Sequence, residues 1–139
     1  MEIDYSSEFG KMVQEHLEHD QVIWLTTVRK DGTPQPGAVW FIWQNGAFVI
    51  FTQPGSQKLK NLARNPRVSL HFNCDPGGDH VVVFFGQAVI DPAVGPSDRV
   101  REYVDKYDEA MRRLNFTWPG VARDYSVALR IVPEKVRGY

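Results

Sequence analysis

A tight turn, a hydroxyl and a cation stand together just before a short predicted helix. The apolar segment Ala47–Thr52 ends there, and Pro54-Gly55-Ser56-Gln57-Lys58 follows it. Free backbone N–H groups and the helix dipole attract anions to a helix N-terminus. A lysine in the first turn opposes that dipole, so Lys58 is a poor choice for helix stability alone. The stretch is either an ordinary helix start or a seat for a phosphate group.

Positive charge continues along this segment. Lys60, Arg64 and Arg67 follow, and no acidic residue lies between positions 58 and 67. Thr52 closes the preceding strand, where its hydroxyl would face the same anion. The same side chains also suit a solvated helix face, so the local sequence leaves both interpretations open.

The aromatic segment Val39-Trp40-Phe41 is the second candidate feature. Its backbone amides and wide side chains offer a surface along which a planar ring can lie. A packed barrel wall needs the same residue types, and composition alone favours that simpler interpretation.

Other common chemistries lack their sequence signals. The chain has no Gly-x-Ser-x-Gly, His-Glu-x-x-His or Cys-x-x-Cys motif. Cys74 has His71 and His80 nearby, but their pattern matches no metal site. We therefore expect a spectator thiol at Cys74 and no bound metal.

Length and composition limit the number of domains, the partners and the cellular compartment that we expect for this chain. The 139 residues suffice for one domain with its own core, which we expect to span residues 1–139. The formal net charge of -1 argues against a nucleic-acid partner, which needs a basic face. The single cysteine allows no internal disulfide and indicates a reducing compartment.

The chain shows no sign of a membrane span or a secretion signal. No apolar run approaches the roughly 20 residues that a spanning helix needs. The first residues, MEIDYSSEFG, are acidic and polar, whereas a signal peptide is basic and then apolar. We therefore expect a cytoplasmic protein without a membrane partner.

Hydrophobic periodicity and turn residues predict the elements. Apolar residues at helical spacing predict helices, and β-branched or aromatic runs between turn signals predict strands. The expected helices are 6–19, 56–64 and 97–114, the last one capped by Ser97. The expected strands are 21–28, 37–44, 47–52, 67–73, 80–90 and 125–132, with a bulge at Gly86.

The first three strands would form an antiparallel meander, because Lys30-Asp31-Gly32 and Asn45-Gly46 are hairpin turn signals. Their nearly continuous apolar character suggests that both faces are covered. Residues 115–121 look irregular, and Pro133 should end the last strand and leave a tail. Six antiparallel strands favour closure into a barrel, which removes exposed edges.

Taken together, these segments resemble the pyridoxamine 5′-phosphate oxidase-like split β-barrel flavoproteins, and within them the deazaflavin (coenzyme F-420) dependent branch. The resemblance covers roughly residues 20–92 and, more loosely, the terminal segment RIVPEKVRGY. Its motifs are a T-x-x-x-D-G-x-P hairpin, V-W-F in the second strand, F-T at the end of the third, G-S-x-K-x-x-N-L-x-x-N-P-x-V, and G-x-A in the long strand.

The resemblance implies a mainly β fold with flanking helices, a six-stranded antiparallel split barrel that forms a homodimer. The cofactor, coenzyme F-420 or alternatively FMN, would lie in a groove between the subunits. The implied cofactor-binding residues are Val39, Trp40 and Phe41 along the ring, and Phe51, Thr52, Ser56, Gln57, Lys58 and Lys60 around the phosphate end.

Two departures from the family pattern bear on the cofactor. Many relatives have arginine where Gln57 stands, so one charged phosphate contact is lost, for which Lys60 can compensate. Relatives that use pyridoxamine phosphate carry a more basic second strand. The segment AVWFIW has no such charge, which argues against vitamin B6 oxidation.

The implied activity is reduction of a small unsaturated molecule by hydride transfer. Such a cofactor supplies the chemistry, which agrees with the lack of an acid–base motif. Trp40, Phe41 and Trp118 would shape the substrate side. The alternatives are an FMN-dependent oxidoreductase, a non-catalytic carrier of flavin or haem, and a barrel that binds single-stranded nucleic acid. The near-neutral charge disfavours the last of these.

Overall fold

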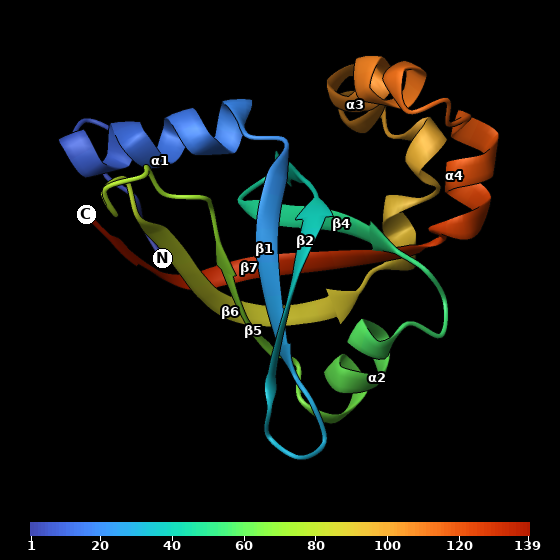
Figure 1. Cartoon of the computed structure of the whole chain (residues 1–139), viewed down its shortest axis with the longest axis horizontal. Helices are drawn as coiled ribbons and strands as arrows, with labels where there is room; N and C mark the ends of the chain where they lie inside the picture. The colour runs from blue at the N-terminus through green and yellow to red at the C-terminus, as the bar shows by residue number, and fades with distance from the viewer.

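The computed structural model describes all residues, 1–139, and shows one antiparallel seven-stranded sheet with four α-helices around it (Figure 1). The helices are α1 (Glu8–His19), α2 (Gln57–Arg64), α3 (Arg101–Arg113) and α4 (Trp118–Asp124). The strands are β1 (Val22–Val28), β2 (Pro34–Trp40), β3 (Ile42–Gln44), β4 (Ala47–Thr52), β5 (Arg67–His71), β6 (Val82–Ile90) and β7 (Val127–Gly138). Two 3₁₀ turns, Pro92–Val94 and Ser97–Arg99, precede α3.

The sheet curls so that its two ends meet. Its strand order is β2-β1-β5-β6-β7-β4-β3, so β2 and β3 stand at opposite ends. They are nevertheless consecutive in the chain and are joined through Phe41 alone. The predicted split barrel with flanking helices is therefore confirmed, with seven strands instead of six.

The seventh strand arises because the predicted strand 37–44 corresponds to two strands in the structure, β2 and β3. The structure divides it at Phe41, whose backbone pairs with α3 and not with a neighbouring strand. The Tyr107 hydroxyl accepts the Phe41 N–H at 2.8 Å, and Lys106 Nζ donates to the Phe41 carbonyl at 2.8 Å. The predicted three-stranded meander is consequently wrong. Its two hairpins form, but β2 pairs with β1 whereas β3 pairs with β4.

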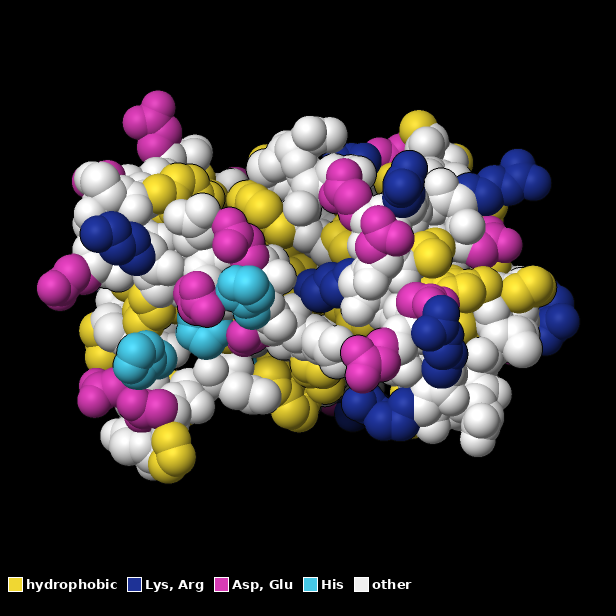
Figure 2. Space-filling view, turned by 90° about the horizontal axis from the view of Figure 1, so that it is seen from above, with side chains coloured by type: hydrophobic (Ala, Val, Ile, Leu, Met, Phe, Trp, Pro, Cys, Tyr) yellow, Lys and Arg dark blue, Asp and Glu magenta, His cyan; other side chains and the backbone are white.

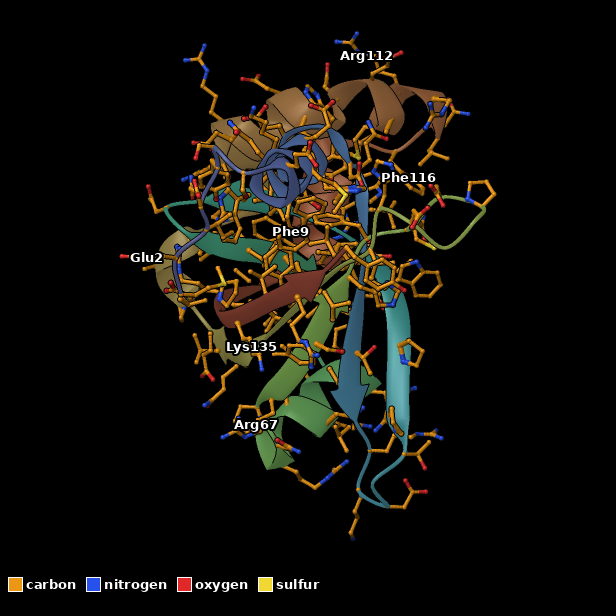
Figure 3. All side chains as sticks on the ribbon, turned by 90° about the vertical axis from the view of Figure 1, so that its left-hand side faces the viewer. Glu2, Phe9, Arg67, Arg112, Phe116 and Lys135 are labelled. Atoms are coloured by element: carbon orange, nitrogen blue, oxygen red, sulfur yellow. The ribbon has the colours of Figure 1, made fainter.

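The main core fills the barrel and is closed at one end by α1. Val13 and Leu17 of α1 join the buried side chains of the strands, and Phe9 packs against the same cluster (Figure 3). Ser7 caps α1 by accepting the Gly10 N–H at 2.9 Å. The helix predicted from the apolar stripe is confirmed.

A second, smaller core lies between the sheet and α3. Val49 and Phe51 of β4 pack there with Tyr103 and Tyr107 of α3. All six residues of β4 are buried, as expected for a strand covered on both faces. In β2 the burial alternates with exposure, so one face of that strand remains open.

The C-terminal third differs most from the sequence prediction. Residues 118–124 form α4, capped by Thr117, where an irregular segment was expected. Strand β7 continues past Pro133 to Gly138, because Pro133 lies opposite Gly86 at a register shift, where a ladder hydrogen bond is not required. Ser97 does not cap α3, and its buried hydroxyl has no hydrogen-bond partner.

Charge is dispersed over the molecular surface. On the face shown in Figure 2, acidic and basic side chains are interspersed without a continuous basic area. None of the helices combines the length and the apolar character that crossing a lipid bilayer requires.

Candidate functional site

The turn between β4 and α2 has the predicted geometry. Gly55 adopts a positive φ of 74°, which reverses the chain at low steric cost. Ser56 is the N-cap of α2, and its Oγ accepts the Leu59 N–H at 3.3 Å. The Thr52 hydroxyl lies 3.4 Å from the same oxygen. Strand end, turn and helix start therefore form one continuous hydrogen-bonded corner.

A cavity of about 250 Å³ opens beside this corner, and we call it the inner cavity. Its walls come from β2, β4, α2, α3 and the segment after α3. The lining residues are Ala38, Val39, Trp40, Phe51, Thr52, Lys58, Tyr103, Phe116, Val121 and Tyr125. Five of them were predicted from the sequence as cofactor-binding residues, namely Val39, Trp40, Phe51, Thr52 and Lys58.

Lys58 is the only charged side chain that lines the inner cavity. It is half-buried, and burial lowers the pKa of its ammonium group. No carboxylate forms an ion pair with it, although the chain forms such pairs elsewhere, as between Arg130 and Asp91. A partly desolvated cation without a counter-ion favours the binding of an anion.

Stacked aromatic rings support the Trp40 side of the inner cavity. Trp40 stacks on Tyr107 with ring centroids 4.4 Å apart and an interplanar angle of 5°. Tyr107 in turn contacts Tyr103, which is buried and has a raised pKa because of that burial. The cavity thus combines one cationic end with a flat apolar wall.

Four predicted site residues do not line the inner cavity. Phe41 is fully buried in the main core, because α3 captures its backbone. Ser56 uses its hydroxyl oxygen as the helix cap. Gln57 donates to Asn61 Oδ1 at 2.9 Å, and Lys60 is exposed to solvent. Phe41 therefore does not line this cavity, and its contact with a bound ring stays a prediction.

Asn61 fixes α2 against the sheet. Its buried amide nitrogen donates to Thr27 Oγ1 and to Gln35 Oε1, both at 2.9 Å. Its oxygen accepts hydrogen bonds from Gln57 and from Arg64. Because both ends of this amide are paired, the helix that carries Lys58 has a defined position on β1 and β2.

The remaining cations lie outside the inner cavity. Arg64 lines a separate open hollow of about 620 Å³ with Arg29, Lys30, Asp31 and Gln57. Arg67 is exposed at the start of β5 (Figure 3). The cations that are close in the sequence therefore lie apart in the structure, and among them only Lys58 lines the inner cavity.

Sequence reasoning missed half of the inner cavity wall. Ala38, Tyr103, Phe116, Val121 and Tyr125 were not predicted, and three of these belong to the segment after α3. The aromatic residues Phe116 and Tyr125 were the sequence feature that could have indicated this part of the cavity wall. Trp118, which was expected at the substrate side, instead anchors α4 by donating to Asp108 at 3.0 Å.

Few side chains in this lining can carry a charge or transfer a proton. Lys58, Tyr103 and Tyr125 are the only titratable side chains in its lining, and no group of three or more metal-ligating side chains occurs in the chain. A reaction here needs a reagent that the ligand brings. The residues fit a ligand with an anionic end and a flat, largely apolar body.

Comparison with known proteins finds one matching family model and solved structures with the same fold. The family model described as pyridoxamine 5′-phosphate oxidase matches residues 9–139. A search of curated proteins finds no match. Among solved structures, an F420 reductase is 26% identical, with a TM-score of 0.65 over 89% of this chain and 94% of that one.

Two further solved structures share the fold. A FAD-binding protein from Mesorhizobium loti is 20% identical, with a TM-score of 0.61 over 89% of this chain and 87% of the other. HutZ, the heme storage protein from Vibrio cholerae, is 15% identical, with a TM-score of 0.65 over 95% of each chain.

Proposed function

Because the chain belongs to the pyridoxamine 5′-phosphate oxidase family, we propose that it is an oxidoreductase that binds a phosphorylated, flavin-type cofactor. We further propose coenzyme F-420 as that cofactor, with FMN as the alternative. The similarity to an F420 reductase supports this order, since it is the highest identity among the structures compared above.

The observation that carries the proposal is the position of Lys58. It is an unpaired, half-buried cation in the lining of a cavity whose other lining residues are uncharged and mostly hydrophobic. Lys58 would hold the cofactor phosphate, together with the Thr52 hydroxyl. Val39 and Trp40 would contact the ring, and the Tyr107 stack would keep Trp40 in place.

When bound, the reduced cofactor would supply a hydride to one carbon of an electron-poor double bond, and a proton from water would complete the reduction. The protein contributes binding and orientation. This division of labour explains why no residue in the cavity lining is placed as a general acid or base.

We also propose that a second copy of the chain completes the site. A cavity of about 250 Å³ is smaller than the roughly 300–1,000 Å³ of most ligand sites. A cofactor of this class would therefore extend beyond the walls that one chain supplies. A homodimer would cover the rest of the ligand.

Titration of the protein with coenzyme F-420 and with FMN, side by side, tests the proposal. Lys58→Ala should weaken binding of the preferred cofactor by about 1.5–3 kcal/mol, the range for a hydrogen bond to a charged group. Fluorescence quenching of the cofactor gives the dissociation constants.

Lys60→Ala is the matched control, because Lys60 lies on the same helix but is exposed and lines no cavity described here. Equal affinities of the Lys58→Ala variant and the wild type would remove Lys58 as the phosphate ligand. Tight binding of a cofactor without oxidation of its reduced form by any acceptor would support the carrier alternative instead.

A further inference from the structure

Tyr103 of α3 is buried, yet its hydroxyl has no hydrogen-bond partner within the chain. Only 3% of the residue is exposed. Ser97 Oγ is the one side-chain polar atom that is both fully enclosed and without a partner, so the Tyr103 hydroxyl oxygen belongs to the small part of its residue that stays accessible. Because Tyr103 lines the inner cavity, this oxygen is open to that space.

Three aromatic rings fix the direction of the Tyr103 side chain. The centroid of its ring lies 4.8 Å from that of Phe51, 4.9 Å from that of Tyr107 and 6.0 Å from that of Trp118. Rings packed at such angles hold a phenol in place but offer no oxygen acceptor to its hydroxyl. Burial raises the pKa of the Tyr103 phenol, so the hydroxyl keeps its proton and remains a donor.

Tyr107, one turn further along α3, shows how a structural hydroxyl behaves in the same surroundings. It accepts the Phe41 N–H at 2.8 Å and lies 2.6 Å from the Gln21 carbonyl oxygen, to which it donates. The Tyr103 hydroxyl makes no such bond. A phenylalanine at this position would keep the ring contacts and avoid the cost of a desolvated hydroxyl. The fold itself therefore gains nothing from this hydroxyl, which points to a ligand in the inner cavity as its partner.

The neighbours of Tyr103 indicate which part of a ligand would meet its hydroxyl. Lys58 is the only charged side chain in the lining and would hold the anionic end of the ligand. Tyr103 packs on Tyr107, and Tyr107 also stacks on Trp40, which would contact the flat ring. A neutral donor on this aromatic side of the cavity suits an uncharged oxygen acceptor on the ring. Flavin-type rings carry two such carbonyl groups.

We propose that the Tyr103 hydroxyl donates a hydrogen bond to a carbonyl oxygen of the cofactor ring and so sets the orientation of the ring against Trp40. This inference rests on the proposed function, because it requires a flavin-type ring in the inner cavity. Hydrogen bonds to the ring of a cofactor also tune its electronic properties. A donor at a ring carbonyl stabilises the electron-rich reduced form, so Tyr103 raises the reduction potential of the bound cofactor.

Ligands with and without a phosphate group separate this role from phosphate binding. Riboflavin has the ring of FMN without its phosphate, and the ring–ribityl part of coenzyme F-420 bears the same relation to that cofactor. Tyr103→Phe should raise the dissociation constants of both members of a pair by the same factor, about 3–10-fold, through loss of one neutral hydrogen bond. Lys58→Ala should weaken the phosphorylated member alone. The reduction potential of the bound cofactor should fall in Tyr103→Phe and stay unchanged in Lys58→Ala.

Urea denaturation without ligand shows whether Tyr103 acts through the fold. Tyr103→Phe should not lower the free energy of unfolding, whereas Tyr107→Phe should lower it, because the Phe41 N–H then loses its acceptor. Tyr5→Phe is the control for binding, since Tyr5 is exposed and does not line the inner cavity. It should change neither the dissociation constants nor the reduction potential.

The outcomes distinguish this inference from the proposed function. Unchanged dissociation constants and an unchanged potential in Tyr103→Phe would overturn the hydrogen bond to the ring. Weakening of the phosphorylated ligand alone would also overturn it, because Tyr103 would then contact the phosphate. Failure of the wild type to bind any of these ligands would instead overturn the proposed function.

Discussion

Three side chains decide the geometry at the junction between β2 and β3. Phe41 has no strand partner, and α3 supplies Tyr107 and Lys106 to its N–H and carbonyl groups. The Tyr107 hydroxyl also donates to the Gln21 carbonyl at 2.6 Å. Burial of Tyr107 raises the pKa of its phenol, so the hydroxyl keeps its proton and remains a donor. These bonds attach α3, which walls the inner cavity, to the point where the barrel closes.

Lys106 should make stability depend on pH in the alkaline range. Its ammonium lies 3.6 Å from the centre of the Phe41 ring, and burial lowers its pKa from 10.5 to about 8, although Asp20 partly opposes the shift. Between these two values the unfolded chain binds a proton that the folded chain does not, so the free energy of unfolding rises with pH there. Below about pH 8 Lys106 is protonated in both the folded and the unfolded chain. The cost of burying its charge in the folded protein is then fully present and no longer changes with pH.

Urea denaturation of the wild type and of Lys106→Met at several pH values from 7.5 to about 10.5 measures this dependence. The stability of the wild type relative to the variant should rise across that range. Lys135→Met is the control, because Lys135 is exposed on β7 (Figure 3), and it should show no such trend. Parallel curves for the wild type and Lys106→Met would contradict the assignment.

At the scale of elements, the contact between β6 and β7 depends on a glycine. The register shifts between Phe85 and Gly86, and Pro133 lies opposite Gly86. A Cβ atom at Gly86 would meet the Val132 carbonyl oxygen at 2.8 Å and Pro133 Cα at 3.2 Å. The bulge therefore needs the close backbone approach that only glycine allows. It also lets β7 continue beyond its proline.

Gly86→Ala should lower the free energy of unfolding by about 1–3 kcal/mol, because the strands must separate to admit a methyl group. Gly37→Ala is the matched control on β2, where an added Cβ meets nothing within 4 Å and φ is not positive. That substitution should be neutral or stabilise by up to about 1 kcal/mol. Urea denaturation measures both, and equal stabilities of the two variants would show that the bulge tolerates a side chain.

At the scale of the whole molecule, the outward side of β6 and β7 remains uncovered. Side chains alternate along β6 and β7, and those that point outward include Phe85, Val89 and Val132. Val89 is 55% exposed and Val132 is 58% exposed. On this outer face Val132 pairs with Gln87, which lies between Phe85 and Val89, and Arg130 pairs with Val89, so exposed apolar side chains are interspersed with polar ones. This face is the surface on which we expect the homodimer to form.

Val132→Arg should convert a dimer into a monomer, since a charge on this face would be buried without a partner. Light scattering coupled to size exclusion measures the mass. Tyr5→Arg is the control, because Tyr5 is an exposed aromatic residue that precedes α1 and belongs to neither β6 nor β7. A monomeric wild type, or a Val132→Arg variant that stays dimeric, would refute this interface. Cofactor affinity should fall with the loss of the dimer.

Local sequence was sufficient for much of the site. Turn chemistry at Gly55 and Ser56 predicted where the chain reverses and where α2 begins, because these signals act over a few residues. The strand that ends at Thr52 and the cation at Lys58 follow from the same stretch. These predictions hold because each depends only on neighbouring residues.

Tertiary contacts decided the rest. Phe41 looked like part of one continuous aromatic strand, and only the approach of α3 removes it from the site. Gln57 was predicted to contact the cofactor phosphate, and in the structure its side-chain amide donates a hydrogen bond to Asn61 instead. The cavity wall joins Ala38 to Tyr125, which no local pattern relates. The sequence by itself determined where the chain turns between β4 and α2 and which cation follows that turn. The packing of α3 and its following segment determined which side chains enclose the adjoining cavity, because enclosure requires contacts between residues far apart in the chain.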